Sequence, residues 1–175
     1  VWYRLADFTQ RHPWSVTFSA LALLLLLAVP ALDMRIGSSD AGNKPTSLTS
    51  RRAYDLLTEG FGAGFNGPLT LVVDTSNATD PTAIDRLVTQ IKDTPGVARV
   101  APPLVNAAGD TAVIAVIPAT SPQSEETETL VHVLRNDVVA PTLEGSGAVG
   151  FVGGPTAAFI DMGDRISERL PMFFA

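Results

Sequence analysis

The sequence contains no cysteine and only two histidines, His12 and His132, among its 175 residues. The lack of cysteine excludes a thiol nucleophile, a disulfide framework and any Cys-ligated zinc or iron–sulfur site. Two isolated histidines also offer little from which to build a His-based catalytic triad or metal site. We therefore expect no catalytic, cofactor-binding or metal-ligating residue in this chain, and we do not expect it to be an enzyme.

Charged residues are sparse, at 17% of the sequence, and acidic residues outnumber basic ones. The net charge is −6, and because residues 1–32 carry +1, the part from Asp33 onward carries −7. The only adjacent pair of Lys or Arg residues is Arg51 and Arg52. Nucleic-acid binding, which depends on a basic surface, is therefore not expected.

One long hydrophobic run, residues 14–32, contains no charged side chain. As a helix, these 19 residues would reach about 28 Å, close to the roughly 30 Å of a bilayer core. Arg11 and Trp14 on one side and Arg35 on the other are typical interfacial anchors. The run predicts a transmembrane helix, and without an ionisable residue it cannot hold a proton relay.

A cleaved secretory signal is the alternative for this run, with Val29, Pro30 and Ala31 as a poor cleavage site. The run is longer than the usual signal core of about 7 to 15 residues, which favours a retained span. Residues 1–13 are predicted to form an interfacial lead-in helix, because Trp2, Leu5 and Phe8 recur every three residues. We expect the N-terminus in the cytoplasm and residues after about 33 outside the cell membrane.

Residues 33–67 are predicted to form a connector. It begins with a stretch rich in Gly, Ser, Asp and Pro, continues with a short helix at 50–59 and ends in a glycine-rich bend at 60–67. Gly62 to Gly67 matches the GxGxxG pattern, but a helix precedes it and a strand follows it, the reverse of a dinucleotide site. We expect no cofactor there, and we expect the glycines to act as a hinge.

The next segment, residues 68–154, alternates between strand and helix patterns. Strands are predicted at 69–73, 97–100, 111–117 and 148–152, with one helix capped by Asp80 and another beginning near Ser121 or Ser124. The second helix is expected to bury Thr127, Leu130, Val131, Leu134 and Val138. This order predicts an α+β fold of the split βαβ, or ferredoxin-like, type with both helices on one face of the sheet.

The last segment, residues 155–175, is predicted to be a helix returning to the membrane. Phe159, Met162 and Ile166 share one face, and Asp161 and Arg165 are spaced to form an i, i+4 pair. Glu125, Glu126 and Glu128 are explained by the dipole at a helix start, and His132 is expected at the surface.

Six short motifs together resemble the MMPL (mycobacterial membrane protein large) family of the resistance-nodulation-division superfamily. They are RHPW at 11–14, LAVPAL at 27–32, RRAYDLL at 51–57, FGAGFNGPL at 61–69, PGV at 95–97 and VGGPTAAFID at 152–161. The resemblance extends over nearly the whole chain and is strongest to the start of the family's second half. The first residue, Val1 rather than Met, also suggests a segment of a longer protein.

The resemblance implies the helix that opens the second repeat, followed by an extracytoplasmic porter domain, in a bacterial cell-membrane transporter. Such a protein uses the proton gradient to export lipids or other hydrophobic molecules, and its partners are the bilayer, the other porter domain and the cargo. The family's proton-relay residues lie in later helices, so none is carried over to this chain. A membrane-tethered or secreted binding domain with no transport role is the alternative.

Overall fold

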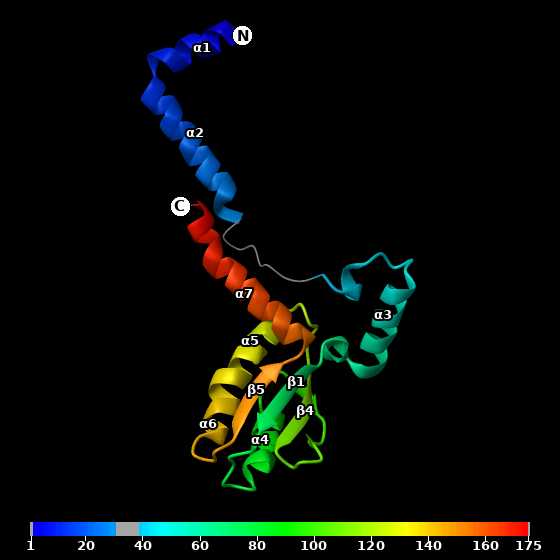
Figure 1. Cartoon of the computed structure of the whole chain (residues 1–175). Helices are drawn as coiled ribbons and strands as arrows, with labels where there is room; N and C mark the ends of the chain where they lie inside the picture. Colours follow the sequence, from blue (N-terminus) through cyan, green and yellow to red (C-terminus); the bar gives the residue numbers. More distant parts are fainter. Residues whose placement is uncertain (1, 31–38, 175) are drawn as a thin grey trace. The chain divides into compact units, whose positions relative to one another are not determined.

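The computed structural model describes residues 2–30 and 39–174. The chain divides into two units, Val1–Arg35 and Ile36–Ala175. The first unit contains helix α1 (Trp2–Arg11) and helix α2 (Pro13–Ala28), and α2 begins with Pro13, whose missing N–H costs nothing at a helix start (Figure 1). The end of the predicted span, at 31–32, and the start of the predicted connector, at 33–38, lie outside the described residues.

The predicted transmembrane span is not confirmed as a complete helix. Among the described residues, no helix is both long and apolar enough to cross a membrane. Helix α2 is apolar but has 16 residues, which give about 24 Å at 1.5 Å per residue.

In the second unit, a connector contacts helix α3 (Thr49–Phe61). The bounds of α3 are close to those of the predicted helix at 50–59. A short 3₁₀ turn, η2 (Ala41–Asn43), is capped by the Asp40 carboxylate, which accepts a hydrogen bond of 2.6 Å from the Gly42 amide. Arg51 of α3 donates to the Gly42 carbonyl oxygen and pairs with Asp55 at 2.7 Å. Arg51 therefore holds the connector against α3.

The glycine-rich bend follows α3 as the 3₁₀ turn η3 (Ala63–Asn66), and strand β1 (Leu69–Asp74) follows the bend. Gly62 has a φ of 95°, which favours glycine, and the rings of Phe61 and Phe65 stack with centroids 4.7 Å apart. The predicted order, helix, bend and then strand, is confirmed. Gly64 is buried against the end of strand β4 (Thr111–Pro118), so the bend is packed at this residue, and its role as a hinge stays a prediction.

Five strands form one antiparallel sheet. They are β1 (Leu69–Asp74), β2 (Val97–Val100), β3 (Leu104–Val105), β4 (Thr111–Pro118) and β5 (Val149–Gly153). The order is β2-β4-β1-β5, with β3 paired to β4. The four long strands follow the split βαβ order predicted from the sequence, and the predicted strand at 111–117 is central. The short β3 is an addition that the sequence pattern does not predict.

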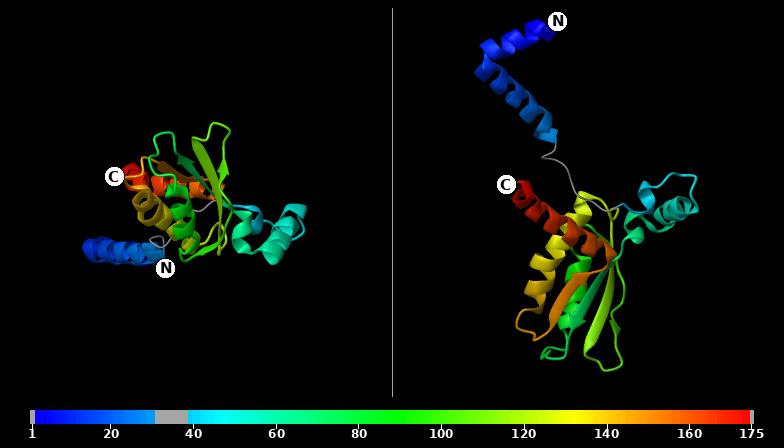
Figure 2. Two further views of the ribbon diagram at one scale, coloured as in Figure 1. Left: turned by 90° about the horizontal axis from the view of Figure 1, so that it is seen from below. Right: turned by 45° about the horizontal axis from the view of Figure 1, so that its top comes forward.

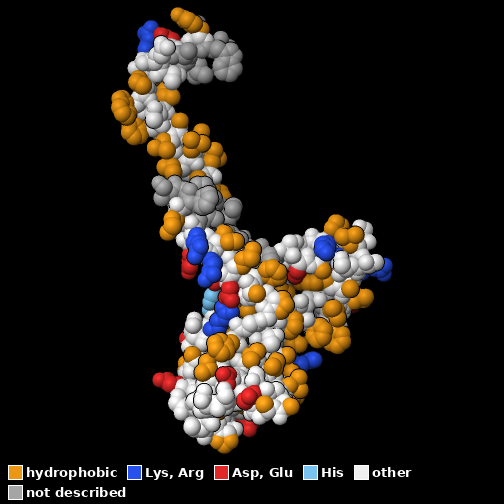
Figure 3. Space-filling view, in the orientation of Figure 1, with side chains coloured by type: hydrophobic (Ala, Val, Ile, Leu, Met, Phe, Trp, Pro, Cys, Tyr) orange, Lys and Arg blue, Asp and Glu red, His pale blue; other side chains and the backbone are white. Residues whose placement is uncertain are grey.

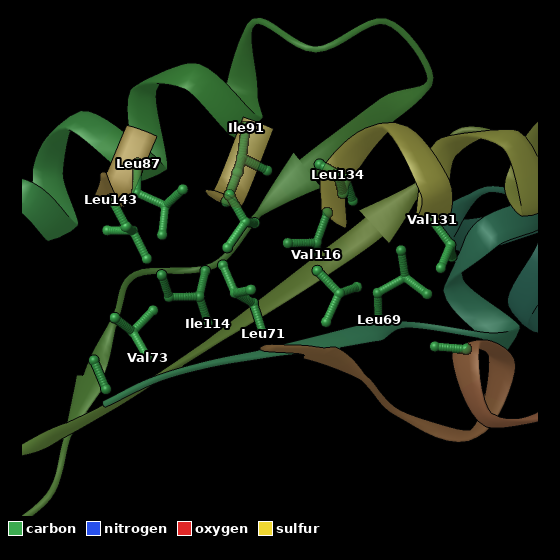
Figure 4. Close-up of a cluster of buried hydrophobic side chains, with 14 of the residues drawn as sticks. Leu69, Leu71, Val73, Leu87, Ile91, Ile114, Val116, Val131, Leu134 and Leu143 are labelled. Carbon is green, nitrogen blue, oxygen red and sulfur yellow. The ribbon is translucent and has the colours of Figure 1, made fainter. Parts of the chain in front are cut away.

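One face of this sheet is covered by helices. They are α4 (Ala83–Lys92), α5 (Glu125–Val133), the π-helical turn η4 (Leu134–Val139) and α6 (Ala140–Leu143), as Figures 1 and 2 show. Alternate residues of the central strands are buried under them, Leu69, Leu71 and Val73 from β1 and Ala112, Ile114 and Val116 from β4. Figure 4 shows the leucine, isoleucine and valine side chains of this set facing Leu87 and Ile91 of α4, Val131 of α5 and Leu134 of η4.

Of the two N-caps predicted from the sequence, the structure confirms the one at α5 and not the one at α4. Ser124 caps α5, because its Oγ accepts a hydrogen bond of 3.2 Å from the Thr127 amide. Asp80 does not cap α4, which starts at Ala83. Instead its carboxylate accepts hydrogen bonds from the Thr82 amide and hydroxyl, at 2.8 and 2.7 Å, and forms a turn before the helix.

The buried stripe of the second helix shifts by one residue at η4. Thr127, Leu130, Val131 and Leu134 are buried as predicted, whereas Val138 is only partly buried against the core and Val139 is the buried residue after Leu134. A π-helical turn contains one extra residue, so the next core position comes five residues after Leu134 instead of four.

Helix α7 (Pro155–Phe174) packs on the domain through its first turns. Thr156, Ala157 and Gly163 are buried there, whereas Phe159 and Met162 remain more than half exposed. Asp161 forms a two-point ion pair with Arg135 of η4, a partner that the sequence did not predict. Arg165, the predicted i, i+4 partner, also lies near enough to lower the pKa of Asp161. A planar guanidinium facing both carboxylate oxygens makes a stronger contact than a flexible i, i+4 pair.

Candidate functional site

The uncovered face of the sheet carries an apolar row that runs across four strands. Val72 of β1 lies between Val113 of β4 and Phe151 of β5, and Leu104 of β3 lies beside Val113. Residues paired across an antiparallel sheet share one face, so these four side chains project together. Phe151 is 61% exposed and Leu104 is 72% exposed. The row is a hydrophobic surface of the kind that contacts a partner or an apolar ligand.

Polar side chains border this row. Asp74 of β1 lies between Thr111 and Val149, and Thr70 lies between Ala115 and Gly153. The Ser76 hydroxyl and the Ser76 amide, the latter at 2.9 Å, donate hydrogen bonds to the Asp74 carboxylate and lower its pKa. The uncovered face is therefore apolar in the middle and polar at its margin.

A second apolar surface surrounds α2 in the first unit. None of its residues is buried, and its exposed leucines run from Leu21 to Leu27. Figure 3 shows hydrophobic side chains along the helix. A helix that is apolar on every side is typical of a membrane or of a buried position.

The third feature is a charged group between α5, η4 and α7, visible in Figure 3 as acidic, basic and histidine side chains beside α7. Arg135 of η4 donates to Asp161 at 2.5 and 3.0 Å and to the carbonyl oxygen of Val152 at 2.8 Å. The hydrogen bond from Arg135 lowers the pKa of Asp161. This contact ties α7 to both η4 and β5.

His132 of α5 lies beside that pair, as the surface residue that the sequence predicts. Its Nε2 atom is 3.6 Å from an Asp164 carboxylate oxygen, and its side chain is 44% exposed. Glu128 belongs to the same group, and all three potential ligand atoms lie within 4.8 Å of one another. The sequence alone did not bring these residues together, because Asp164 comes from a separate helix, although the spacing of Glu128 and His132 places both on one face of α5.

The sequence also did not identify the uncovered apolar row. A signal was present, because the segment TAVIAVI (111–117) is apolar at both alternating sets of positions. One set fills the core, and the other set contributes Val113 and Ala115 to the uncovered face.

Comparison with known proteins gives relatives along nearly the whole chain. Membrane protein YdfJ of Bacillus subtilis is 38% identical over 99% of this chain. The mycolic acid-containing lipids exporter MmpL11 of Mycolicibacterium smegmatis is 29% identical over 99% of it, and the heme uptake protein MmpL11 of Mycobacterium tuberculosis is 28% identical over 98%. The chain spans 23% of the first of these relatives, 19% of the second and 18% of the third.

The search of solved structures finds the mycobacterial membrane protein MmpL11D2, with a TM-score of 0.37 and 20% identity over 49% of this chain and 99% of that chain. No family model matches the sequence.

Proposed function

Because the chain belongs to the MmpL family of membrane proteins, we propose that it forms the extracytoplasmic porter domain of a transporter. The observation that carries this proposal is the alignment with YdfJ and MmpL11 over 98 to 99% of the chain. The α+β unit with one uncovered sheet face supports it, because a wall domain needs a surface that the chain itself leaves free. The proposal divides the chain into five parts. They are the interfacial lead-in (1–13), the transmembrane helix (14–32), the connector (33–67), the porter domain (68–154) and the helix returning to the membrane (155–175).

The proposed membrane anchor is residues 14–32. Its support is the uncharged sequence and the exposure of apolar side chains on every side of α2. In this proposal α1 lies in the cytoplasmic interface and the domain after about residue 33 lies outside the membrane. Helix α7 then leads the chain back towards the bilayer.

The proposed cargo is a lipid or another hydrophobic molecule, moved at the expense of the proton gradient. Two relatives are named for such cargo, one for mycolic acid-containing lipids and one for heme. The apolar row around Val72 offers a surface that fits either the cargo or a second porter domain. Residues 14–32 contain no ionisable side chain, so the proton is proposed to pass through other helices of the transporter.

The anchor is tested by expressing the chain in bacteria and washing the membranes with alkaline carbonate. We expect the unprocessed chain to stay in the membrane fraction, with its N-terminal residues retained. Leu24→Arg should cost about 2.5 to 3.5 kcal/mol of insertion free energy and release protein. Leu56→Arg, at an exposed position of α3, is the matched control and should change nothing. A mature N-terminus at Leu32 would support the secreted alternative.

Transport is tested with the longer protein that we propose contains this chain, reconstituted in liposomes with a fluorescent lipid. We expect movement of the lipid only while a proton gradient is imposed. Phe151→Asp should slow that movement, whereas Leu48→Asp, at an exposed position outside the sheet, should not. Equal rates with and without the gradient would refute proton coupling, and equal rates for the two variants would refute a role for the uncovered face.

A further inference from the structure

We propose that Glu128, His132 and Asp164 form a binding site for a divalent transition-metal ion, and that Zn²⁺ is the ion that fits it best. The site joins α5 to α7 and is separate from the uncovered sheet face. Its three residues each offer one ligand atom, and these atoms lie within 4.8 Å of one another.

The helix geometry brings the three ligands close together. Glu128 and His132 are four residues apart on α5, so their side chains lie on the same face of that helix. Asp164 reaches the same point from α7. All three residues are partly exposed, so the side chains can turn to complete the coordination and an ion can enter from solvent.

The distance between His132 Nε2 and Asp164 Oδ2 is the most specific observation. At 3.6 Å it is longer than a usual hydrogen bond, and the two groups form an ion pair when the imidazole is protonated. Two ligands at about 2.0 to 2.1 Å from a tetrahedral zinc ion are separated by about 3.4 Å. The pair is therefore spaced as two ligands of one ion would be.

The donor set selects among cations. Imidazole nitrogen is a ligand of Zn²⁺ and other transition-metal ions, whereas Mg²⁺ and Ca²⁺ prefer sites made of oxygen alone. Three protein ligands leave the fourth tetrahedral position open to water. One imidazole with two carboxylates therefore fits Zn²⁺ better than Mg²⁺ or Ca²⁺.

The surrounding charges permit a cation. On η4, the guanidinium of Arg135 is neutralised by Asp161, with contacts of 2.5 and 3.0 Å. On α7, Arg165 lies near enough to Asp161 to lower the pKa of that carboxylate. The site itself contains two carboxylates, Glu128 and Asp164, whose negative charge suits a divalent ion.

Bound metal would fasten α7 to α5. An ion that binds only the folded chain raises the unfolding temperature in proportion to the logarithm of its concentration. This gives a readout that does not depend on transport.

The test uses the full chain in detergent micelles, without a histidine tag and after removal of metal with EDTA and dialysis. Calorimetric titration with Zn²⁺ should give one site per chain, and Co²⁺ should produce the visible absorption of a tetrahedral centre. His132→Gln and Asp164→Asn should each weaken Zn²⁺ binding at least about tenfold, because even supporting residues of metal sites have effects of that size. Zn²⁺ should raise the unfolding temperature of the parent chain but not that of either variant.

Two matched controls remove equivalent groups elsewhere. His12→Gln removes the other imidazole of the chain and Asp93→Asn removes an exposed carboxylate after α4, and both should bind Zn²⁺ like the parent. The unfolding temperatures in EDTA show that His132→Gln and Asp164→Asn retain the fold. The proposal is overturned if Zn²⁺ binds no more tightly than Mg²⁺, or if His12→Gln weakens binding as much as His132→Gln does.

Discussion

Gly64 lies directly against the carbonyl group of Pro118, so closely that a Cβ atom added to Gly64 would be 1.9 Å from the Pro118 oxygen. This contact joins the glycine-rich bend to the end of β4. The bend is therefore a packed part of the domain at this point, and glycine is needed there because no side chain fits.

The first prediction follows from that contact. Gly64→Ala should lower the free energy of unfolding by about 1 to 3 kcal/mol or more, because the backbone must move to relieve the overlap. Gly60→Ala is the matched control, since Gly60 is in α3 and a Cβ there meets nothing within 4 Å. It should stabilise the chain by about 0.5 to 1 kcal/mol. Urea unfolding of both variants measures the difference, and equal stability would contradict the packing described here.

The second prediction compares neighbours on opposite faces of β4. Ile114 is fully buried, whereas Val113 is 37% exposed on the uncovered face. Ile114→Ala should cost about 2 to 5 kcal/mol through lost burial and a cavity. Val113→Ala should cost less than about 1 kcal/mol, the range of strand propensity. Similar losses in urea unfolding would show that both faces of β4 are covered.

The third prediction concerns acid stability. Arg135 lowers the pKa of Asp161 below its ordinary value of 3.8, so the folded state prefers the charged carboxylate. The resulting stabilisation is fully present above about pH 4 and is lost as the pH falls through the lowered pKa. The parent chain should therefore be more stable than Asp161→Asn at pH 7, and the two should converge in acid. A stability difference that does not change down to pH 2 would contradict this account.

The spacing of apolar residues along the sequence was enough to predict most of the fold. The compact apolar runs at 69–73 and 111–117 and the helical spacing of Leu87 and Ile91 predict buried strands and a helix laid on one core, and the structure confirms that core. The order of elements then limits the topology. Because βαβ crossovers are right-handed, both crossover helices lie on the same face of the sheet.

The features that could not be predicted depend on contacts between distant elements. The π-helical turn makes Val139 the buried residue and leaves Val138 partly buried, and residue spacing alone does not indicate where such a turn occurs. Asp161 pairs with Arg135 because α7 packs beside η4, a neighbour that local i, i+4 spacing does not reveal. The same packing brings Asp164 to His132.

We propose that residues 14–32 cross the membrane and place the following domain outside the cell. Because the chain has no cysteine, a single introduced cysteine reports its own side of the membrane. Gln10→Cys and Asp93→Cys lie on the two sides of the proposed span, and both positions are exposed. In intact bacteria, a membrane-impermeant maleimide should label Asp93→Cys at once and Gln10→Cys only after the membrane is permeabilised. Equal labelling of the two positions in intact cells, or labelling of Asp93→Cys only after permeabilisation, would contradict the account.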